Sequence, residues 1–382
     1  MAGKPRLLFV VTEDWYFASH RFELARAAGD AGFDVALATR VSTWRERIEA
    51  AGIPVFPLRF MRRSSRNPWI EATAIGELTT LYREWRPDVV HHVAAKPVIY
   101  GGLAARAAGV RRVVAALAGL GHAFASERAS ARMLRPALLA AYRAALKQRS
   151  VRLIVQNPED ERFVLERRLV PPADVRVIRG SGVDTQVFHP HEEAGGPPTF
   201  VLVARMLWDK GVGEFVDAAR QLRQVEVPAR FLLVGEADPE NPAAIAREQL
   251  LRWHREGHIE WWGQRSDMPE VLAGAHVACL PSYREGLPKT LLEAAASGLP
   301  LIATDVPGCR EIAVHGDTAL LVPPRDARSL AEAMQRLASD ADLRRRLGVA
   351  ARQRVCDNFS TERITGQTIA LYRELIETCA SA

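Results

Sequence analysis

The chain has few cysteines and no long apolar segment. Its four cysteines lack the paired spacing that disulfide frameworks and zinc sites use: Cys279, Cys309, Cys356 and Cys379. No apolar run reaches the roughly 18 residues needed to span a bilayer. The apolar stretch 7–11 is too short for a signal-peptide core, because it runs into charged residues. These absences favour a reduced cytoplasmic protein without a transmembrane helix.

Motifs for nucleic acids and dinucleotides are also missing. The chain has no helix-turn-helix, zinc-finger or RNA-binding signature, and its first β-α-β pattern lacks the Gly-x-Gly-x-x-Gly fingerprint. Charge is nevertheless uneven: residues 1–180 hold 29 Lys and Arg against 17 Asp and Glu, a formal charge of +12, and the remainder carries −6. This favours an anionic surface, but no nucleic acid, as a partner of the first half. The alternative is a chain that is simply rich in arginine.

Strand-like apolar runs alternate with helical patterns along the chain, which predicts an α/β protein. At 382 residues the chain is too long for one core and suits two domains. We expect strands near 6–12, 32–39, 87–92, 112–117, 152–156 and 175–178, and again near 200–204, 230–235, 259–263, 276–280, 300–304 and 319–322. The glycine-rich run 180–184 indicates a hinge. We therefore predict domains at 1–182 and 183–358 and a terminal helix at 359–382.

The segment 281–298 combines two carboxylates with the start of a helix. Glu285 precedes the helix, Glu293 lies eight positions later, and Pro288 suits the first helical turn. The amides around 286–290 have no partner within the helix and form an anion site. A phosphate site flanked by two carboxylates that bind hydroxyl groups fits a sugar nucleotide as the ligand. A carboxylate at a helix start and a solvated helical glutamate are the alternative.

Two cations follow the first strand of the second half. Arg205 and Lys210 lie five positions apart on a loop that leads into a helix, so they could neutralise a diphosphate from two sides. Solvated surface cations are the alternative. The sequence has one Asp-x-Asp triplet, Asp340–Asp342, and its place on a late helix indicates a helix cap rather than a metal site.

These motifs together resemble a known family. The segment from Val201 to Glu311, with its Glu, seven residues, Glu pattern and the turn Val306–Glu311, resembles the retaining glycosyltransferases of family 4. The resemblance implies the GT-B fold, in which two Rossmann-like β/α/β domains face each other across a cleft. The C-terminal domain would then bind a nucleotide-sugar donor, and the anomeric configuration would be retained.

The resemblance also implies roles for particular residues. The catalytic group would be Glu285, Arg205, Lys210 and His122, where Arg205 and Lys210 hold the pyrophosphate and Glu285 binds sugar hydroxyls. The donor-binding group would be Glu293, on the ribose diol, with Gly286, Leu287, Pro288, Lys289, Thr290 and Arg265. We expect no cofactor and no metal, because cations and helix amides take the place of a divalent ion.

The first half indicates the acceptor. A branch of the family that acts on lipid-linked sugars carries a similar aromatic-Ser-His-Arg loop, which implies acceptor contacts for His20 and Arg21. The loop 93–102 resembles the same branch, in which it borders the active cleft, and this implies an acceptor contact for Lys96. A helix-capping histidine with a solvated arginine is the alternative. The aromatic and basic segment 60–69 and the helix near 130–149 suit an anionic membrane, although the helix could equally pack inward.

We therefore expect an enzyme on the inner face of the cytoplasmic membrane. It would move an N-acetylhexosamine or hexose from a UDP-sugar to a polyprenyl-diphosphate-linked saccharide in bacterial glycan assembly. A sugar-nucleotide epimerase with the same fold and a non-catalytic sugar-nucleotide sensor are the alternatives.

Overall fold

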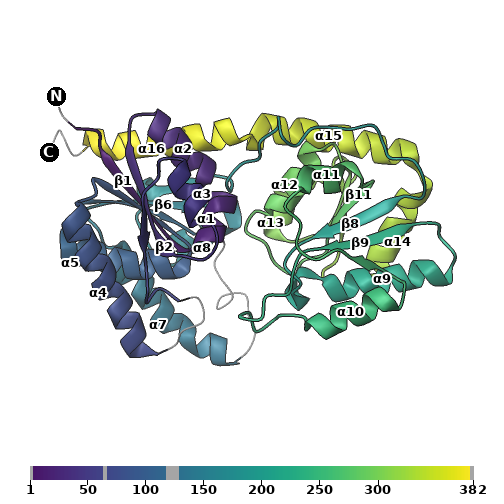
Figure 1. Cartoon of the computed structure of the whole chain (residues 1–382), viewed down its shortest axis with the longest axis horizontal. Coiled ribbons are helices and arrows are strands. Elements are labelled where there is room, and N and C mark those ends of the chain that lie inside the picture. Colours follow the sequence, from purple (N-terminus) through teal and green to yellow (C-terminus); the bar gives the residue numbers. More distant parts are fainter. Residues whose placement is uncertain (1–2, 63–66, 118–128, 379–382) are drawn as a thin grey trace. The chain divides into compact units, whose positions relative to one another are not determined.

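The computed structural model describes residues 3–62, 67–117 and 129–378, which form two compact units (Figure 1). The first unit comprises Met1–Ser181 together with Glu362–Ala382, and the second comprises Gly182–Thr361. Each unit is built on one sheet, and every strand pairing in the described residues is parallel. The α/β class expected from the sequence is confirmed.

The first unit has a seven-stranded sheet in the order β3-β2-β1-β4-β5-β6-β7. Its strands are β1 (Arg6–Glu13), β2 (Asp34–Arg40), β3 (Val55–Pro57), β4 (Val89–Val93), β5 (Arg112–Ala116), β6 (Ser150–Val155) and β7 (Val175–Val177). Its helices are α1 (Asp14–His20), α2 (Phe22–Asp30), α3 (Arg45–Ala50), α4 (Pro68–Trp85), the π-helical turn η1 (Pro97–Gly101), α5 (Gly102–Ala108), α7 (Ala129–Leu146), α8 (Pro158–Glu166), the 3₁₀ turn η2 (Pro172–Asp174) and α16 (Thr361–Thr378).

The second unit has a six-stranded sheet in the order β10-β9-β8-β11-β12-β13. Its strands are β8 (Thr199–Val203), β9 (Arg230–Val234), β10 (Glu260–Trp261), β11 (Val277–Leu280), β12 (Leu301–Thr304) and β13 (Ala319–Val322). Its helices are the 3₁₀ turn η3 (Trp208–Lys210), α9 (Val212–Gln224), α10 (Arg247–Arg255), α11 (Met268–Ala273), α12 (Lys289–Ala296), α13 (Pro307–Arg310), α14 (Ala327–Ser339) and α15 (Ala341–Phe359).

The strands bury both faces, as parallel strands between helices must. Along β1, Leu8 and Val10 belong to one buried apolar cluster, whereas Leu7 and Phe9 belong to another, because successive side chains point to opposite faces. The second unit repeats this arrangement in β8 and its neighbours. Each sheet therefore has one layer of buried apolar side chains on each of its two faces.

The structure contains elements that the sequence did not indicate, α1 and β3 among them. The segment 13–21, expected as a loop, forms α1, whose Tyr16 and His20 stack one turn apart with ring centroids at 4.2 Å. The three-residue strand β3 is too short to show an alternating pattern. All twelve expected strands are present.

Helix α16 packs on the first unit. Tyr372 is fully buried, and its hydroxyl lies 2.6 Å from Nδ1 of His91 on β4 in a hydrogen bond. Glu374 forms ion pairs with Arg152 at 2.7 Å and Arg176 at 3.2 Å. These contacts tie the end of the chain to strands β4, β6 and β7.

Both sheets reverse their winding direction at one point. In the first unit the reversal lies between β1 and β4, and in the second it lies between β8 and β11. In open α/β sheets, ligands bind beside the carboxyl ends of the strands at such a switch point. A binding site is therefore expected in the loops that follow β1, β4, β8 and β11.

Candidate functional site

Two loops meet at the switch point of the second unit. The loop after β8 carries Arg205 and Lys210, and the loop after β11 carries Glu285. Gly211 allows the loops to approach, because a Cβ atom at this position would lie 2.1 Å from the Pro281 carbonyl oxygen. Its φ of +72° also favours glycine. Gly211 therefore permits the close contact of these loops.

An ion pair joins the loops. Nζ of Lys210 lies 2.5 Å from Oε1 of Glu285, and the two side chains are only 21% and 10% exposed. The structure thus brings together two predicted residues that are 75 positions apart in the chain. Glu285 therefore contacts a cation in the structure, whereas its place before the helix predicted contact with hydroxyl groups. The pair places one positive and one negative group at the same point of the site.

Helix α12 begins beside this pair. The sequence predicted Pro288 in the first helical turn, but the helix starts at Lys289, and Pro288 is the preceding cap residue. Its extended backbone, with ψ of 111°, accounts for the difference. Glu293 is 8% exposed and lies 3.2 Å from Nζ of Lys289, one turn earlier. Burial raises the pKa of Glu293, and the Lys289 charge opposes that rise.

The remaining donor-side residues support the same loop. Leu287 packs against the apolar cluster of the sheet, and Thr290 lies in the first turn of α12. The carbonyl oxygen of Gly286 closely approaches Gly308 of α13, where a Cβ atom would lie only 2.4 Å away. This contact explains why the turn 306–311 contains a glycine, and it packs the turn against the loop that carries Gly286.

Arg205 has a partner that the sequence did not indicate. Its Nη1 lies 2.7 Å from Oδ2 of Asp238, which follows β9 and is 12% exposed. Asp238 stands in no recognisable motif, and only the adjacency of β8 and β9 brings it to Arg205. Arg205, Lys210 and Lys289 therefore each have a carboxylate counter-ion in this structure.

The structure also places two other features predicted for the second unit, Arg265 and the Asp-x-Asp triplet. Arg265 is exposed, pairs with Asp267 through Nε at 2.8 Å and lies over the Trp262 ring. The Asp340 carboxylate accepts a hydrogen bond from the Leu343 amide at 2.8 Å, so the Asp-x-Asp triplet does begin a helix as a cap. We find Arg265 in contact with its own loop, not with the Lys210–Glu285 pair.

His20 and Arg21 follow β1 at the switch point of the first unit. Arg21 is 5% exposed and donates to the carbonyl oxygens of Gly180 at 3.2 Å and His20 at 3.3 Å. Its Nε is buried and has no hydrogen-bond partner in the described residues. Burial, and secondarily the Arg21 charge, lower the pKa of His91. Arg21 is therefore a buried cation with spare donor capacity, not a solvated side chain.

Lys96 lies at the start of η1, after β4. Its Nζ lies 2.8 Å from Oε1 of Glu71 and 2.7 Å from the carbonyl oxygen of Arg62. The preceding Ala94 has a φ of +76°, which is strained for a residue with a side chain. Lys96 thus joins the π-helical turn to α4 and to segment 59–62. His122, the remaining predicted residue, lies outside the described residues.

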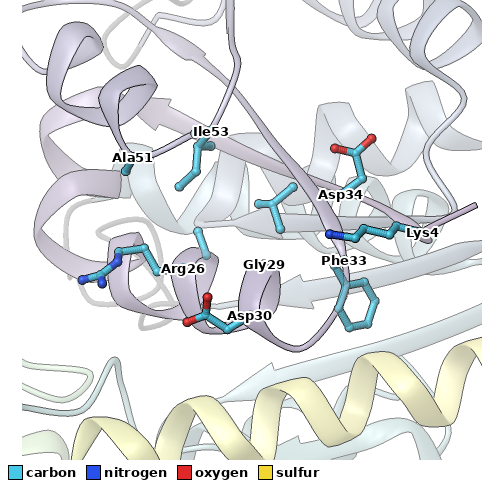
Figure 2. A pocket seen from close by; sticks show the side chains of 11 residues that line it. Lys4, Arg26, Gly29, Asp30, Phe33, Asp34, Ala51 and Ile53 are labelled. Atoms are coloured by element: carbon cyan, nitrogen blue, oxygen red, sulfur yellow. The ribbon is translucent and has the colours of Figure 1, made fainter.

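Cavities in both units lie away from these loops. A cavity of about 290 Å³ opens beside the start of β2 in the first unit, where Lys4, Asp30 and Asp34 line it (Figure 2). A cavity of about 480 Å³ lies beside Pro300, before the start of β12 in the second unit. Both lie at amino ends of strands, whereas the candidate residues follow carboxyl ends. Neither cavity contains a candidate residue.

Two family models match the chain on either side of the hinge. The model described as "Glycosyl transferase 4-like" matches residues 6–157, and the one described as "Glycosyl transferases group 1" matches residues 197–340. The second match contains Arg205, Lys210, Glu285 and Glu293. These matches define the chain as a glycosyltransferase.

Solved structures show the same fold. Sucrose-phosphate synthase from Thermosynechococcus elongatus superposes with a TM-score of 0.81 at 21% identity, over 98% of this chain and 100% of that one. Anabaena HepE in complex with UDP and glucose gives 0.77 at 16% identity, over 96% and 99%. Together with the family models, this establishes a GT-B glycosyltransferase. The chain belongs to the family-4 glycosyltransferases that the Glu, seven residues, Glu pattern predicted.

Curated relatives cover most of the chain. The N,N'-diacetylbacillosaminyl-diphospho-undecaprenol α-1,3-N-acetylgalactosaminyltransferase of Campylobacter jejuni is 27% identical over 346 residues, which are 87% of this chain and 89% of the relative. A UDP-Gal:α-D-GlcNAc-diphosphoundecaprenol α-1,3-galactosyltransferase from Escherichia coli is 26% identical over 312 residues, 78% of each chain. Both names describe transfer to a diphosphate-linked lipid saccharide.

Proposed function

We propose that this glycosyltransferase moves an N-acetylhexosamine or hexose from a UDP-sugar to a polyprenyl-diphosphate-linked saccharide. The observation that carries the donor side is the Lys210–Glu285 pair at the switch point of the second unit, beside the start of α12. The acceptor class rests on the two relatives that are similar over most of this chain.

The chemistry follows from these groups. The bond between the sugar C1 and the UDP oxygen breaks, a bond from C1 to an acceptor hydroxyl oxygen forms, and the hydroxyl proton passes to the departing phosphate. Negative charge grows on the β-phosphate, where Arg205, Lys210 and the positive end of the α12 dipole would stabilise it. Because the leaving phosphate takes the proton on the face where the acceptor attacks, configuration is retained without a separate base. In this proposal the cations replace a metal ion.

Donor binding would exchange the partners of the site. Lys210 and Lys289 now contact Glu285 and Glu293. A diphosphate that takes over the two ammonium groups would release the carboxylates, Glu285 to the sugar hydroxyls and Glu293 to the ribose diol. The same carboxylates would therefore pair with the ammonium groups before the donor binds and recognise the donor afterwards.

Arg21 suits the acceptor diphosphate. It is buried, its Nε has no hydrogen-bond partner in the described residues, and it lies at the switch point of the first unit. An arginine can donate to phosphate oxygens with two groups at once, which compensates the burial of its charge. His20, adjacent to Arg21 and stacked on Tyr16, would complete this contact. Lys96 would act indirectly, because it is engaged with Glu71.

The first unit would also dock on an anionic membrane. Trp69 at the start of α4 is 83% exposed, and Met133 and Leu134 on α7 are 81% and 60% exposed. Exposed apolar side chains beside basic residues suit the membrane interface. Within the described residues, no helix has both the length and the apolar character needed to cross a membrane. Binding at the cytoplasmic face would bring the enzyme to its lipid-linked acceptor.

Nucleotide titration tests the donor site. Isothermal titration with UDP and with GDP, in the presence of EDTA, should show preferential binding of UDP to the wild type and weakened binding to Lys210→Ala. Arg328→Ala is the matched control, because Arg328 is an exposed cation of the same unit that pairs with Glu332. If UDP fails to bind the wild type, or binds Lys210→Ala equally well, the donor site is wrong.

Vesicle sedimentation tests the membrane contact. The wild type should sediment with phosphatidylglycerol vesicles more than with phosphatidylcholine vesicles, and a Trp69→Ser/Met133→Ser/Leu134→Ser variant should lose this binding. Val349→Ser is the matched control, because Val349 is 66% exposed in the second unit. Equal sedimentation of the triple variant and the wild type would contradict the proposed contact.

A further inference from the structure

We propose that Tyr283 is a positioning residue, which sets the distance between the Lys210 loop and the Glu285 loop through its bond to Glu214. The inference rests on the proposed function, because it concerns how the donor's diphosphate site is assembled. Tyr283 lies two residues before Glu285, and Glu214 lies four residues after Lys210 on α9. Neither residue belongs to the predicted site.

Tyr283 contacts the other loop on both sides of Lys210. Its backbone amide donates to the carbonyl oxygen of Asp209 at 2.9 Å, and its hydroxyl donates to Oε1 of Glu214 at 2.6 Å. One contact precedes Lys210 and the other follows it. A residue that bonds on both sides of Lys210 fixes where the ammonium group stands relative to Glu285.

The glutamate makes this bond strong. Oε1 of Glu214 accepts the Tyr283 hydroxyl, and the other oxygen, Oε2, is buried without a hydrogen-bond partner in the described residues. Burial and the Glu214 carboxylate raise the pKa of Tyr283, so the hydroxyl remains a donor at neutral pH. A hydrogen bond from a neutral donor to a carboxylate is shorter and stronger than one between neutral groups.

A third loop holds the tyrosine ring. The Arg325 guanidinium, between β13 and α14, lies 4.5 Å from the centre of the Tyr283 ring. Arg325 has a φ of +61°, a backbone conformation that side chains disfavour and that the surrounding structure must impose. The loops after β8, β11 and β13 therefore converge on one aromatic ring.

Other contacts fix the backbone but do not reach α9. Ser282 is fully buried, and its hydroxyl donates to the Asp209 carbonyl oxygen at 3.1 Å. Thr304 in turn hydrogen-bonds to the Ser282 carbonyl oxygen. These bonds would keep the fold intact when the Tyr283 hydroxyl is removed. The hydroxyl is therefore available for precise placement of Lys210 without being needed for folding.

A double-mutant cycle tests the proposal. Tyr283→Phe keeps the ring over Arg325 and removes the bond to Glu214, and Glu214→Leu removes the acceptor. A misplacement of about 1 Å can lower the rate on the order of a hundredfold, so a partial loosening should lower kcat at least about tenfold. The KM for the acceptor should not change. Glu214→Gln keeps an acceptor oxygen and should retain most of the activity.

The losses in kcat caused by Tyr283→Phe and by Glu214→Leu should not be additive. Because both substitutions break one bond, Tyr283→Phe/Glu214→Leu should be no slower than the slower single variant. The matched control is Tyr82→Phe, which removes a comparable hydroxyl bond, 2.9 Å to Nε2 of His92, from the first unit. The kcat of Tyr82→Phe should equal that of the wild type. Unfolding temperatures verify that each variant folds, and if Glu214→Leu does not fold, Tyr283→Phe and Glu214→Gln carry the comparison.

The outcomes separate this inference from the proposed function. If the wild type binds UDP and transfers sugar while Tyr283→Phe keeps kcat within twofold, Tyr283 has no positioning role. Fully additive losses also overturn the inference. If the wild type neither binds UDP nor transfers sugar, the proposed function fails and this inference fails with it.

Discussion

Lys210→Met separates the role of the Lys210–Glu285 pair in stability from its role in transfer. Methionine keeps the length of the side chain and removes the charge. Glu285, 10% exposed, then loses the cation at 2.5 Å. Breaking a fully buried pair costs about 3–5 kcal/mol, and an exposed pair is worth at most about 1 kcal/mol. For side chains 21% and 10% exposed we expect a loss of about 2 kcal/mol in the unfolding free energy of the second unit.

Lys210→Met should lower kcat by more than its loss of stability explains. Removing one preorganised cation from a site where charge develops costs about 3 kcal/mol, or on the order of a hundredfold in kcat. Adding Glu285→Gln to Lys210→Met removes the uncompensated carboxylate, so the double variant should regain stability. It should not regain activity, because both groups that would contact the donor are then absent.

Urea unfolding and steady-state transfer kinetics measure the two effects on the same samples. Arg220→Met is the matched control in the second unit, because Arg220 pairs with Glu256 at 2.6 Å and both side chains are 34% exposed. It should lose at most about 1 kcal/mol of stability and no activity. The reasoning is refuted if Lys210→Met keeps kcat within threefold of the wild type, or if the double variant regains activity together with stability.

Three further predictions concern charge. Asp238→Asn should bind UDP more tightly than the wild type, as titration would show, because in the proposed site Asp238 would compete with the diphosphate for Arg205; weaker binding would contradict this competition. Burial raises the pKa of Glu293 above its ordinary value of 4.5, so protonation and weaker UDP binding should begin at a pH above 4.5 as the pH falls. Titrations from neutral to acidic pH should show this decline in the wild type and not in Glu293→Gln. Burial lowers the pKa of His92 from its ordinary 6.5 to about 3, so the unfolded chain binds a proton that the folded chain excludes, and the unfolding free energy should decrease as the pH falls below 6.5. Urea unfolding should show a smaller decrease in His92→Gln, and equal slopes would contradict this assignment.

Much of the fold was predictable from the sequence because parallel strands leave a local signal. Runs such as 7–11 are apolar throughout, since both faces of the strand are buried, and each is followed by a helical pattern. The segment that forms α1 is aromatic and polar without an apolar stripe, so it resembled a loop. The strand β3 shows no pattern because it has three residues.

The sequence indicated candidate residues for the site but not the contacts that they make. The spacing of Glu285 and Glu293 and the family resemblance indicated which residues to expect. The partners arise from the order of strands: Lys210 meets Glu285 because β8 neighbours β11, and Arg205 meets Asp238 because β8 neighbours β9. Strand order is a tertiary property, and no local pattern specifies it.

Sugar transfer itself tests the central proposal most directly. Purified enzyme would be given radiolabelled UDP-N-acetylgalactosamine, UDP-galactose, UDP-N-acetylglucosamine and UDP-glucose, each with a polyprenyl-diphosphate-linked saccharide and, separately, with the same saccharide lacking lipid and diphosphate. We predict that at least one donor labels the lipid-linked acceptor, in EDTA, with retention of configuration, and that the lipid-free saccharide is a much poorer acceptor. Equal labelling of both acceptors, or no labelling from any of the four UDP-sugars, would contradict the account.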